Sequence, residues 1–506
     1  MKVNQLKAGV VLSYLSQGLS ILIGLLYTPV MLRLLGQSQY GLYQLSASVI
    51  SYLGLLSLGF GSSYVRYYAR YKIQGDTKGI AKLNGMFMTI FIVIGVISAL
   101  AGSVLIANIE TMFRGSLTGG ELETARILMI FMVFNLAVSF PGSVFSSYIT
   151  ANEQYVFQRA VTILSNVLNP FLSIPLLLLG CRSIGLVVIQ TVLSAACLTA
   201  NWIFCRKKLG IRFTFRNFEW GFLKELFLFS FWIFLNQVID QVNWNVDKFI
   251  LGIVGGTVTV AVYGVAAQLN SLYLNFSVSI SNVFAPRVNR IVNETDDNNQ
   301  LTDLFTRVGR VQFLILMLIV SGLAVFGKYF IQIWAGPDYG EAYRIALLLI
   351  VPAVIPWIQN LGIEIQRAKN KHQFRSVVYA AIAVLNICAS IPLAKLYGGT
   401  GAAIGTAASL LIGNGLIMNL FYHKKIGLDM VYFWKQIAAF LPALILPAAA
   451  GFLIVKFIAF HSFFIFLGAA AAYTAVYCAS MWFLGMNQSE KELIRAPLRN
   501  LAYRRK

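Results

Sequence analysis

Two short stretches of the sequence place arginines about one helical turn apart. "SYVRYYARYK" (63–72) contains Arg66 and Arg70 among four tyrosines, and "APRVNR" (285–290) contains Arg287 and Arg290. The planar guanidinium group matches the paired oxygens of phosphate or pyrophosphate, and a tyrosine ring offers a flat face to a sugar. We therefore predict two anion-binding clusters. The alternative interpretation is an aromatic belt combined with the positive charge that marks the cytoplasmic side of a membrane.

A third stretch, "NQVIDQVNWNVDK" (236–248), carries a polar stripe. Asn236, Asp240, Asn243 and Asp247 follow one another at steps of four, three and four residues, which keeps them within an arc of about 60° on a helix. A carboxylate inside a membrane helix costs roughly 2.5 kcal/mol or more, so it usually faces water or a partner. We predict a cavity wall that binds sugar hydroxyls or a coupling ion, with Asp240 deeper than Asp247. The alternative is that Asp247 and Lys248 pair locally at the outer end of the helix.

A fourth polar position follows a pair of prolines. Pro352 and Pro356 interrupt one apolar run, and Asn360 and Glu364 follow on the next two turns. Because proline removes a backbone donor and clashes with the preceding turn, we expect this helix to bend. Glu364 joins the candidate cavity or ion-coupling residues, although its simplest role is to pair with Arg367 near the cytoplasmic edge.

The elements that carry these residues are predicted to be membrane-spanning helices. Of the 506 residues, 58% are hydrophobic and 12% are charged, whereas soluble domains contain about 25% charged residues. Continuous apolar runs of about 18 to 25 residues recur along the chain, long enough to cross hydrocarbon as helices. We identify about fourteen such runs and predict an all-α integral membrane protein; the runs do not alternate as barrel strands do.

The positions of the charges explain the formal net charge of +21. Most lysines and arginines fall in alternate loops, which is the positive-inside pattern and argues against a nucleic-acid partner. An even number of spans then leaves both termini in the cytoplasm, and the first apolar run is expected to stay as a helix and not to be a cleaved leader. The cysteines and histidines lack metal-ligand spacing, and Gly322–Lys328 lacks the Ser/Thr of a phosphate-binding loop, so we expect no metal and no cofactor.

The chain also repeats itself. "NPFLSIPLLLLG" begins at Asn169 and "NICASIPLAKLYG" begins at Asn386, and Gly36 and Tyr43 of one half correspond to Gly256 and Tyr263 of the other. Parallel repeats of this kind enclose a ligand path between them. The predicted organisation is a first six-helix bundle, a cytoplasmic linker, a second six-helix bundle, and a terminal helix pair with a basic tail, at 1–206, 207–221, 222–425 and 426–506.

The order of these motifs resembles a known family. "LLGQSQYGLYQLSASVISYLGLLSLGFGSSYVRYYA" (34–69) is similar to the second-helix signature of the Wzx-type polysaccharide flippases, in the multidrug/oligosaccharidyl-lipid/polysaccharide exporter superfamily. "VDKFILG" (246–252) resembles the ending of their seventh helix, and "ANEQYVF" and "AKNKHQF" share an A-x5-F spacing. The likeness extends over almost the whole chain.

The resemblance implies a fold and a function. Members have two six-helix bundles in a V shape, like the MATE transporters, and alternate between inward-open and outward-open states. The implied cargo is an oligosaccharide on undecaprenyl pyrophosphate, moved to the outer leaflet of the bacterial cytoplasmic membrane without chemistry on any bond. A coupling ion (H⁺ or Na⁺), membrane lipids and other polysaccharide-assembly proteins are the implied partners. Members commonly place cationic residues in the cavity, and the middle of the first span here has no arginine.

Three alternatives stay open at this point. A MATE-like exporter of drugs or cations would have an acidic binding lobe. A membrane polysaccharide polymerase or glycosyltransferase would need catalytic acids near a sizeable outer loop, and the loops here are short. A non-transporting scaffold for the synthesis machinery would tolerate mutations in the cavity.

Overall fold

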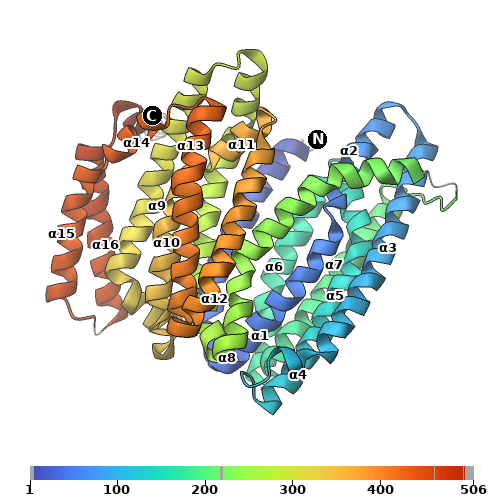
Figure 1. Cartoon of the computed structure of the whole chain (residues 1–506), viewed down its shortest axis with the longest axis horizontal. Helices are drawn as coiled ribbons and strands as arrows, with labels where there is room; N and C mark the ends of the chain where they lie inside the picture. The colour runs from blue at the N-terminus through green and yellow to red at the C-terminus, as the bar shows by residue number, and fades with distance from the viewer. Residues whose placement is uncertain (1–4, 217–219, 461, 494, 496–506) are drawn as a thin grey trace, which may run out of the picture. The chain divides into compact units, whose positions relative to one another are not determined.

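The computed structural model describes residues 5–216, 220–460, 462–493 and 495, which form helices and connecting turns with no strand among them (Figure 1). The predicted basic tail, which ends in Tyr503-Arg504-Arg505-Lys506, lies outside the described residues, as does the very start of the chain. The helices are α1 (Gln5–Leu53), η1 (Gly54–Ser57), α2 (Phe60–Ile73), α3 (Thr77–Ala107), α4 (Ile109–Met112), α5 (Gly119–Ala151), α6 (Tyr155–Leu178), α7 (Arg182–Lys207), α8 (Trp220–Glu294), α9 (Asn298–Trp334), η2 (Pro337–Tyr339), α10 (Ala342–Ile358), α11 (Leu361–Ala368), α12 (His372–Leu410), η3 (Leu411–Met418), α13 (Asn419–Phe421), η4 (Tyr422–Ile426), α14 (Met430–Ala438), α15 (Leu441–Phe457), α16 (Phe463–Ser480) and η5 (Met481–Gly485).

The helices are those of a multi-pass membrane protein, as predicted. Among the described residues, 10 helices are long and apolar enough to cross a membrane, and one bent pair, α10 with α11, raises this number to 11. The angle of 42° within this pair follows Pro352 and Pro356, where we expected a bend. Three of the long helices, α1, α8 and α12, are divided internally by a glycine. The number fourteen stays a prediction, because it depends on how these divided helices are counted.

The dividing glycines in α1 and α8 occupy equivalent places in the sequence repeat. Gly36 has φ 72° and ψ 171°, and Gly256 has φ 70° and ψ −168°. This region of backbone space is essentially restricted to glycine. Two glycines that correspond in the sequence therefore reverse the chain in the same way, and each turns one apolar run into the next without a loop.

The described residues form two compact units. The first contains the chain up to Gly264 together with Ser390–Ala402, and the second contains Val265–Ala389 and the chain from Ala403 onward. This division falls within α8 and α12. The predicted bundles at 1–206 and 222–425 describe the sequence repeat and stay a prediction.

The first unit packs α3, α5 and α7 beside one another, with α2 covering one end (Figure 1). Its core is aromatic: the ring of Tyr64 meets that of Phe87 edge-on at 5.1 Å, and Phe60 meets Phe91 at 6.4 Å. The hydroxyl of Tyr64 donates to Asn84 Oδ1, so its polar end is satisfied inside the core. This core holds α2 in a fixed rotation about its own axis.

The second unit is organised around α9, which contacts α10, α11, α14, α15 and α16. α15 and α16 run side by side (Figure 1) and form the terminal helix pair. Phe326 of α9 and Tyr473 of α16 pack edge-on at 5.5 Å between centroids, within a small buried cluster.

Alanine at Gly36 or Gly256 is expected to destabilise the protein. Each substitution forces a side chain into a glycine-only conformation, at a cost of about 1 to 3 kcal/mol. The cost should be larger at Gly256, where an added Cβ would lie 2.8 Å from the Ser116 carbonyl oxygen. The measurement is the thermal unfolding midpoint of the purified protein in detergent. Gly18→Ala is the control, since nothing lies within 4 Å of its added Cβ. Equal midpoints for Gly18→Ala and Gly36→Ala would contradict the proposed strain.

Candidate functional site

The predicted arginine cluster on α2 is only partly as expected. Arg66 and Arg70 are both exposed, on one face of the helix. Tyr64, Tyr67 and Tyr68 are at most 4% exposed and pack into the core of the first unit, so the prediction that these rings offer flat faces to a sugar was wrong. The helical period separates the two residue types, which places the tyrosines inward and the arginines outward.

The second arginine cluster lies at the end of α8, in the second unit. Arg290 Nε lies 3.0 Å from both carboxylate oxygens of Glu294, an exposed pair one turn apart. Arg287 is also exposed and lines a cavity of about 410 Å³. The two arginines thus differ, because Arg290 has a carboxylate partner and Arg287 faces an open space.

Glu364 has the partner that the sequence predicts. Arg367 donates to it at 2.8 Å, and the carboxylate side chain is 21% exposed. The pair lies on α11, after the bend.

The polar stripe of α8 runs from an exposed to a buried environment. Asp240 is exposed, and Asn236 and Asn243 are half-buried. Asp247 is 3% exposed and accepts a short hydrogen bond from the hydroxyl of Tyr263, beyond the Gly256 break in the same helix. The more buried carboxylate is therefore Asp247 and not Asp240, and the hydroxyl of Tyr263 stabilises it locally.

Lys248 reaches away from the stripe. Its Nζ donates to Gln44 Oε1 at 3.2 Å, and Gln44 Nε2 donates in turn to the hydroxyl of Tyr40 at 2.7 Å. A half-buried ammonium group in an apolar helix therefore uses neutral amide and hydroxyl groups as partners, and these belong to α1.

This contact belongs to a longer polar seam between α8 and the α1–α2 segment, all within the first unit. The pairs run antiparallel, so that the α8 residues rise in number as their partners fall. The seam consists of Ser230 with Ser63 (2.8 Å between hydroxyl oxygens), Gln237 with Ser57 (3.5 Å), Gln241 with Ser51, and Lys248 with Gln44.

The sequence contains a signal for this seam that the predicted stripe does not include. Ser230, Gln237, Gln241 and Lys248 are spaced seven, four and seven residues apart, which places them on one face about 110° around the helix from the predicted stripe. α8 therefore carries two polar faces. The partners on α1 and α2 could not be inferred from spacing, since nothing in a single sequence pairs residues that lie so far apart.

The seam ends at a carboxylate that joins three helices. Glu121 Oε1 accepts from Ser38 at 2.6 Å and from Thr257 at 2.8 Å, and its Oε2 accepts from the backbone N–H and the hydroxyl of Thr118, each at 2.9 Å. Ser38 follows the Gly36 break and Thr257 follows the Gly256 break. One side chain at the start of α5 thus connects both repeat-related breaks.

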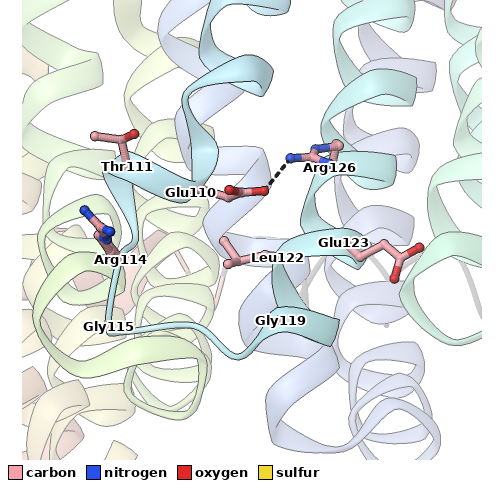
Figure 2. Close-up of a pocket in the computed structure, with 8 residues that line it drawn as sticks. All are labelled: Glu110, Thr111, Arg114, Gly115, Gly119, Leu122, Glu123 and Arg126. Atoms are coloured by element: carbon pink, nitrogen blue, oxygen red, sulfur yellow. Dashed lines mark hydrogen bonds and ion pairs between the residues drawn. The ribbon is translucent and has the colours of Figure 1, made fainter.

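A cavity of about 700 Å³ lies where α4 leads into α5, and Glu121 is not among its lining residues (Figure 2). Figure 2 shows Arg126 pointing toward Glu110, and their ion pair measures 2.8 Å. Arg114 and Glu123 also line the cavity, so its charged groups balance. Such a lining offers donors and acceptors equally and does not select an anion.

The geometry of the first unit supports reversible contact between helices. Apart from Lys248, the seam consists of serine and glutamine side chains, whose hydrogen bonds exchange with water at a net cost of about 0.5 to 1.5 kcal/mol each. Buried ion pairs would be far more costly to separate. Breaking the seam would therefore cost less than separating the same number of buried ion pairs.

Comparison with known proteins identifies the family of the chain. The sequence profile of a family described as polysaccharide biosynthesis proteins matches residues 6–292, more than half of its length. The chain belongs to this family. The matched region includes α1 to α7 and almost all of α8, so it contains both glycine breaks and the complete seam.

Two relatives of the polysaccharide biosynthesis family support the assignment. The chain is 23% identical over 440 residues to the membrane protein EpsK of Bacillus subtilis (strain 168), with 83% of each chain covered. It is 20% identical over 403 residues to a protein of Shigella flexneri described as an O-antigen transporter, covering 78% of this chain and 91% of the relative.

Solved structures with the same fold extend beyond that family. The inward closed conformation of the lipid II flippase MurJ superposes with a TM-score of 0.72 at 16% identity, covering 93% of this chain and 97% of MurJ. An inward-facing multidrug resistance MATE transporter superposes with a TM-score of 0.64 at 14% identity, covering 83% and 99%. The predicted MATE-like helical membrane fold is confirmed.

Removal of the Glu121 carboxylate is expected to loosen the junction of α1, α5 and α8. Glu121→Ala leaves the hydroxyls of Ser38 and Thr257 without their acceptor, which should lower the free energy of unfolding by about 1 to 3 kcal/mol. The measurement is the thermal midpoint in detergent. Glu123→Ala removes an exposed carboxylate two residues away and should change the midpoint little. If both variants melt alike, Glu121 does not stabilise the breaks.

Proposed function

We propose that the protein moves a lipid-linked oligosaccharide across the bacterial cytoplasmic membrane, from the inner to the outer leaflet. Membership of the polysaccharide biosynthesis family over residues 6–292 is the observation that carries this proposal. The names of the similar Shigella O-antigen transporter and of the lipid II flippase with the same fold point in the same direction. The carrier is proposed to be undecaprenyl pyrophosphate, and both termini are proposed to lie in the cytoplasm.

The physical problem in such transport is the polar head of the cargo. A pyrophosphate joined to sugars cannot enter hydrocarbon, where each unsatisfied polar group costs several kcal/mol. The protein is proposed to supply polar and cationic surface while the polyprenyl chain stays in lipid. Arg66 and Arg70 are exposed on α2, Arg287 faces a cavity, and the Asn236 and Asn243 amides lie on α8. These residues, with Arg290, are the proposed contacts for pyrophosphate and sugar.

Access is proposed to alternate through opening of the α8 seam. Hydrogen bonds between side chains can be replaced by water, so the seam can open and close at low cost, and the Gly36 and Gly256 breaks allow the adjoining helix segments to tilt. Closure of the seam excludes water, and its opening exposes the polar faces of α8 to the cargo. No covalent bond changes in this cycle.

A coupling ion is proposed to act at the carboxylates of α8. The buried Asp247, which accepts from Tyr263, directly precedes Lys248, which donates to Gln44 in the seam. Binding of H⁺ or Na⁺ near Asp247 would change the local charge next to Lys248 and so bias the seam. Asp240, which is exposed, and Glu364, which pairs with Arg367, are second candidates for this role. Membrane lipids and other polysaccharide-assembly proteins are the proposed partners.

Complementation of a deletion strain tests the proposal. Arg66→Ala/Arg70→Ala and Arg287→Ala/Arg290→Ala are each expected to reduce surface polysaccharide about ten-fold or more, equal to a loss of about 1.4 kcal/mol in substrate binding. Asp240→Asn, which removes the charge of a candidate ion-coupling carboxylate, is expected to reduce it as well. Arg344→Ala, an exposed arginine outside the proposed contacts, is the control at matched expression. Full complementation by all three variants would refute the site. Loss of drug resistance with normal surface polysaccharide would refute the function in favour of a drug exporter.

A disulfide across the seam is expected to arrest transport. In a background without the five native cysteines, Ser63→Cys/Ser230→Cys should form a bond, because the two hydroxyl oxygens lie 2.8 Å apart. Flipping is measured in vesicles as access of a membrane-impermeant oxidant to the glycan; it should stop on oxidation and return with dithiothreitol. Ser62→Cys/Ser230→Cys, with Ser62 exposed on another face of α2, is the control. Undiminished flipping by the oxidised Ser63 variant would show that the seam does not open.

A further inference from the structure

We propose that a cavity in the second unit is a binding site for a phosphate group. The cavity measures about 410 Å³ and lies between the end of α8, the first turns of α9, α14 and the segment after η5. Its polar lining comprises Arg287, Gln300, Asp303, Thr306, Arg307, Arg310, Tyr432, Gln436, Asn487, Ser489 and Glu490. Four separate parts of the chain thus bring donors to one cavity.

One wall of the cavity is fixed by a buried ion pair. Arg310 Nε lies 2.5 Å from Glu490 Oε1 and Arg310 Nη2 lies 3.0 Å from Oε2, with both side chains at most 5% exposed. Further N–H groups of Arg310 donate to the carbonyl oxygens of Gln436 and Gly485, and its guanidinium stacks on the ring of Phe440 at 4.2 Å. Arg310 and Glu490 therefore satisfy each other and build the wall, and neither is available to a ligand.

Two arginines of the lining keep their charge available. Arg287 and Arg307 are both exposed, and across the described part of the chain no carboxylate lies within ion-pairing distance of either. Asp303 is the one other acid of the lining. Two guanidinium groups against one carboxylate leave a positive cavity, which favours an anion with several acceptor oxygens.

A buried hydroxyl in the same lining also needs an acceptor. Thr306 is 4% exposed, and its Oγ1 is a buried atom with no hydrogen-bond partner in the described structure. Its neighbour Thr302, one turn earlier on α9, donates to the Asn298 carbonyl oxygen at 2.8 Å, as a helical threonine usually does. An unsatisfied buried hydroxyl costs about 1 to 3 kcal/mol. A phosphate oxygen in the cavity would accept from Thr306 as well as from the two arginines.

Phosphate is the group that fits this set of donors. It offers three or four acceptor oxygens in a compact tetrahedron, whereas a neutral sugar would leave the arginine charges uncompensated and a metal cation would be repelled by them. The phosphate can belong to a lipid headgroup or to a soluble compound. The cavity shares Arg287 with the cargo contacts proposed above, but the inference does not rest on transport, because a phosphate can bind here whether or not the protein flips a glycan.

The test uses the full-length protein in nanodiscs and two probes. Inorganic pyrophosphate is titrated calorimetrically into nanodiscs of phosphatidylcholine, and phosphatidic acid is scored by native mass spectrometry in mixed nanodiscs, both at fixed salt because charge contacts are screened. Arg287→Gln/Arg307→Gln is expected to weaken binding of at least one probe ten-fold or more. Thr306→Val, which removes only the hydroxyl, is expected to weaken it two- to five-fold.

Lys435→Gln is the matched control. Lys435 is exposed and lies on α14 next to the cavity residue Gln436, but does not line the cavity. Binding of pyrophosphate alone identifies a soluble ligand, and binding of phosphatidic acid alone identifies a lipid headgroup; either supports the site. No binding of either probe, or equal weakening by Lys435→Gln and the double arginine variant, would overturn it. The flipping assay is scored separately, so failure here leaves the proposed function to its own test.

Discussion

Hydrocarbon offers no hydrogen-bond partners, and this constraint determines where the chain can be irregular. Backbone groups inside the membrane must be satisfied within helices, and a long helix can break where a glycine adopts an unusual conformation and side chains supply the missing partners. Gly36 and Gly256 are such points. Glu121 supplies acceptors for the hydroxyls next to both of them. The α1 and α8 reversals thus share a single carboxylate that lies on a third helix.

The same constraint explains the chemistry of the contact between α8 and the α1–α2 segment. An apolar contact would be indistinguishable from lipid and would hold the helices with little specificity, whereas charged pairs would be difficult to separate. Neutral hydroxyl and amide pairs are more specific than an apolar contact and cost less to separate than charged pairs. Lys248 is the exception, and it too bonds to neutral groups, Gln44 and through it Tyr40. This composition suits the opening and closing that we propose for this interface.

Much of the fold could be predicted from the sequence, because hydropathy and repeats act locally. The apolar runs, the correspondence of Gly36 with Gly256 and the pairing of Glu364 with Arg367 all follow from spacing along the chain. The helical period also predicts that the α2 tyrosines share one face, which is the buried one, so the affinity of tyrosine rings for sugars is a poor guide to their position here. The partners of Lys248 could not be predicted, since they depend on which distant helix lies alongside.

The candidate sites likewise combine features that local sequence predicts with features that depend on distant parts of the chain. Exposure of Arg66 and Arg70 was predictable from charge, whereas the cavity at Arg287 depends on α9, α14 and a segment some 200 residues later in the chain. Thr306 gives no signal in the sequence at all, because most helical threonines satisfy their hydroxyl on their own backbone. Only the structure shows that the buried Thr306 hydroxyl has no hydrogen-bond partner and so marks a candidate binding site.

The ion pair of Arg310 with Glu490 has a consequence for biosynthesis. Arg310 precedes Glu490 by 180 residues, so Arg310 is synthesised long before the carboxylate that pairs with it. Loss of one member of such a pair typically costs about 3 to 5 kcal/mol. A nonsense or frameshift mutation shortly upstream of Glu490 would therefore spare every long apolar helix, yet yield a polypeptide that cellular quality control should recognise and degrade.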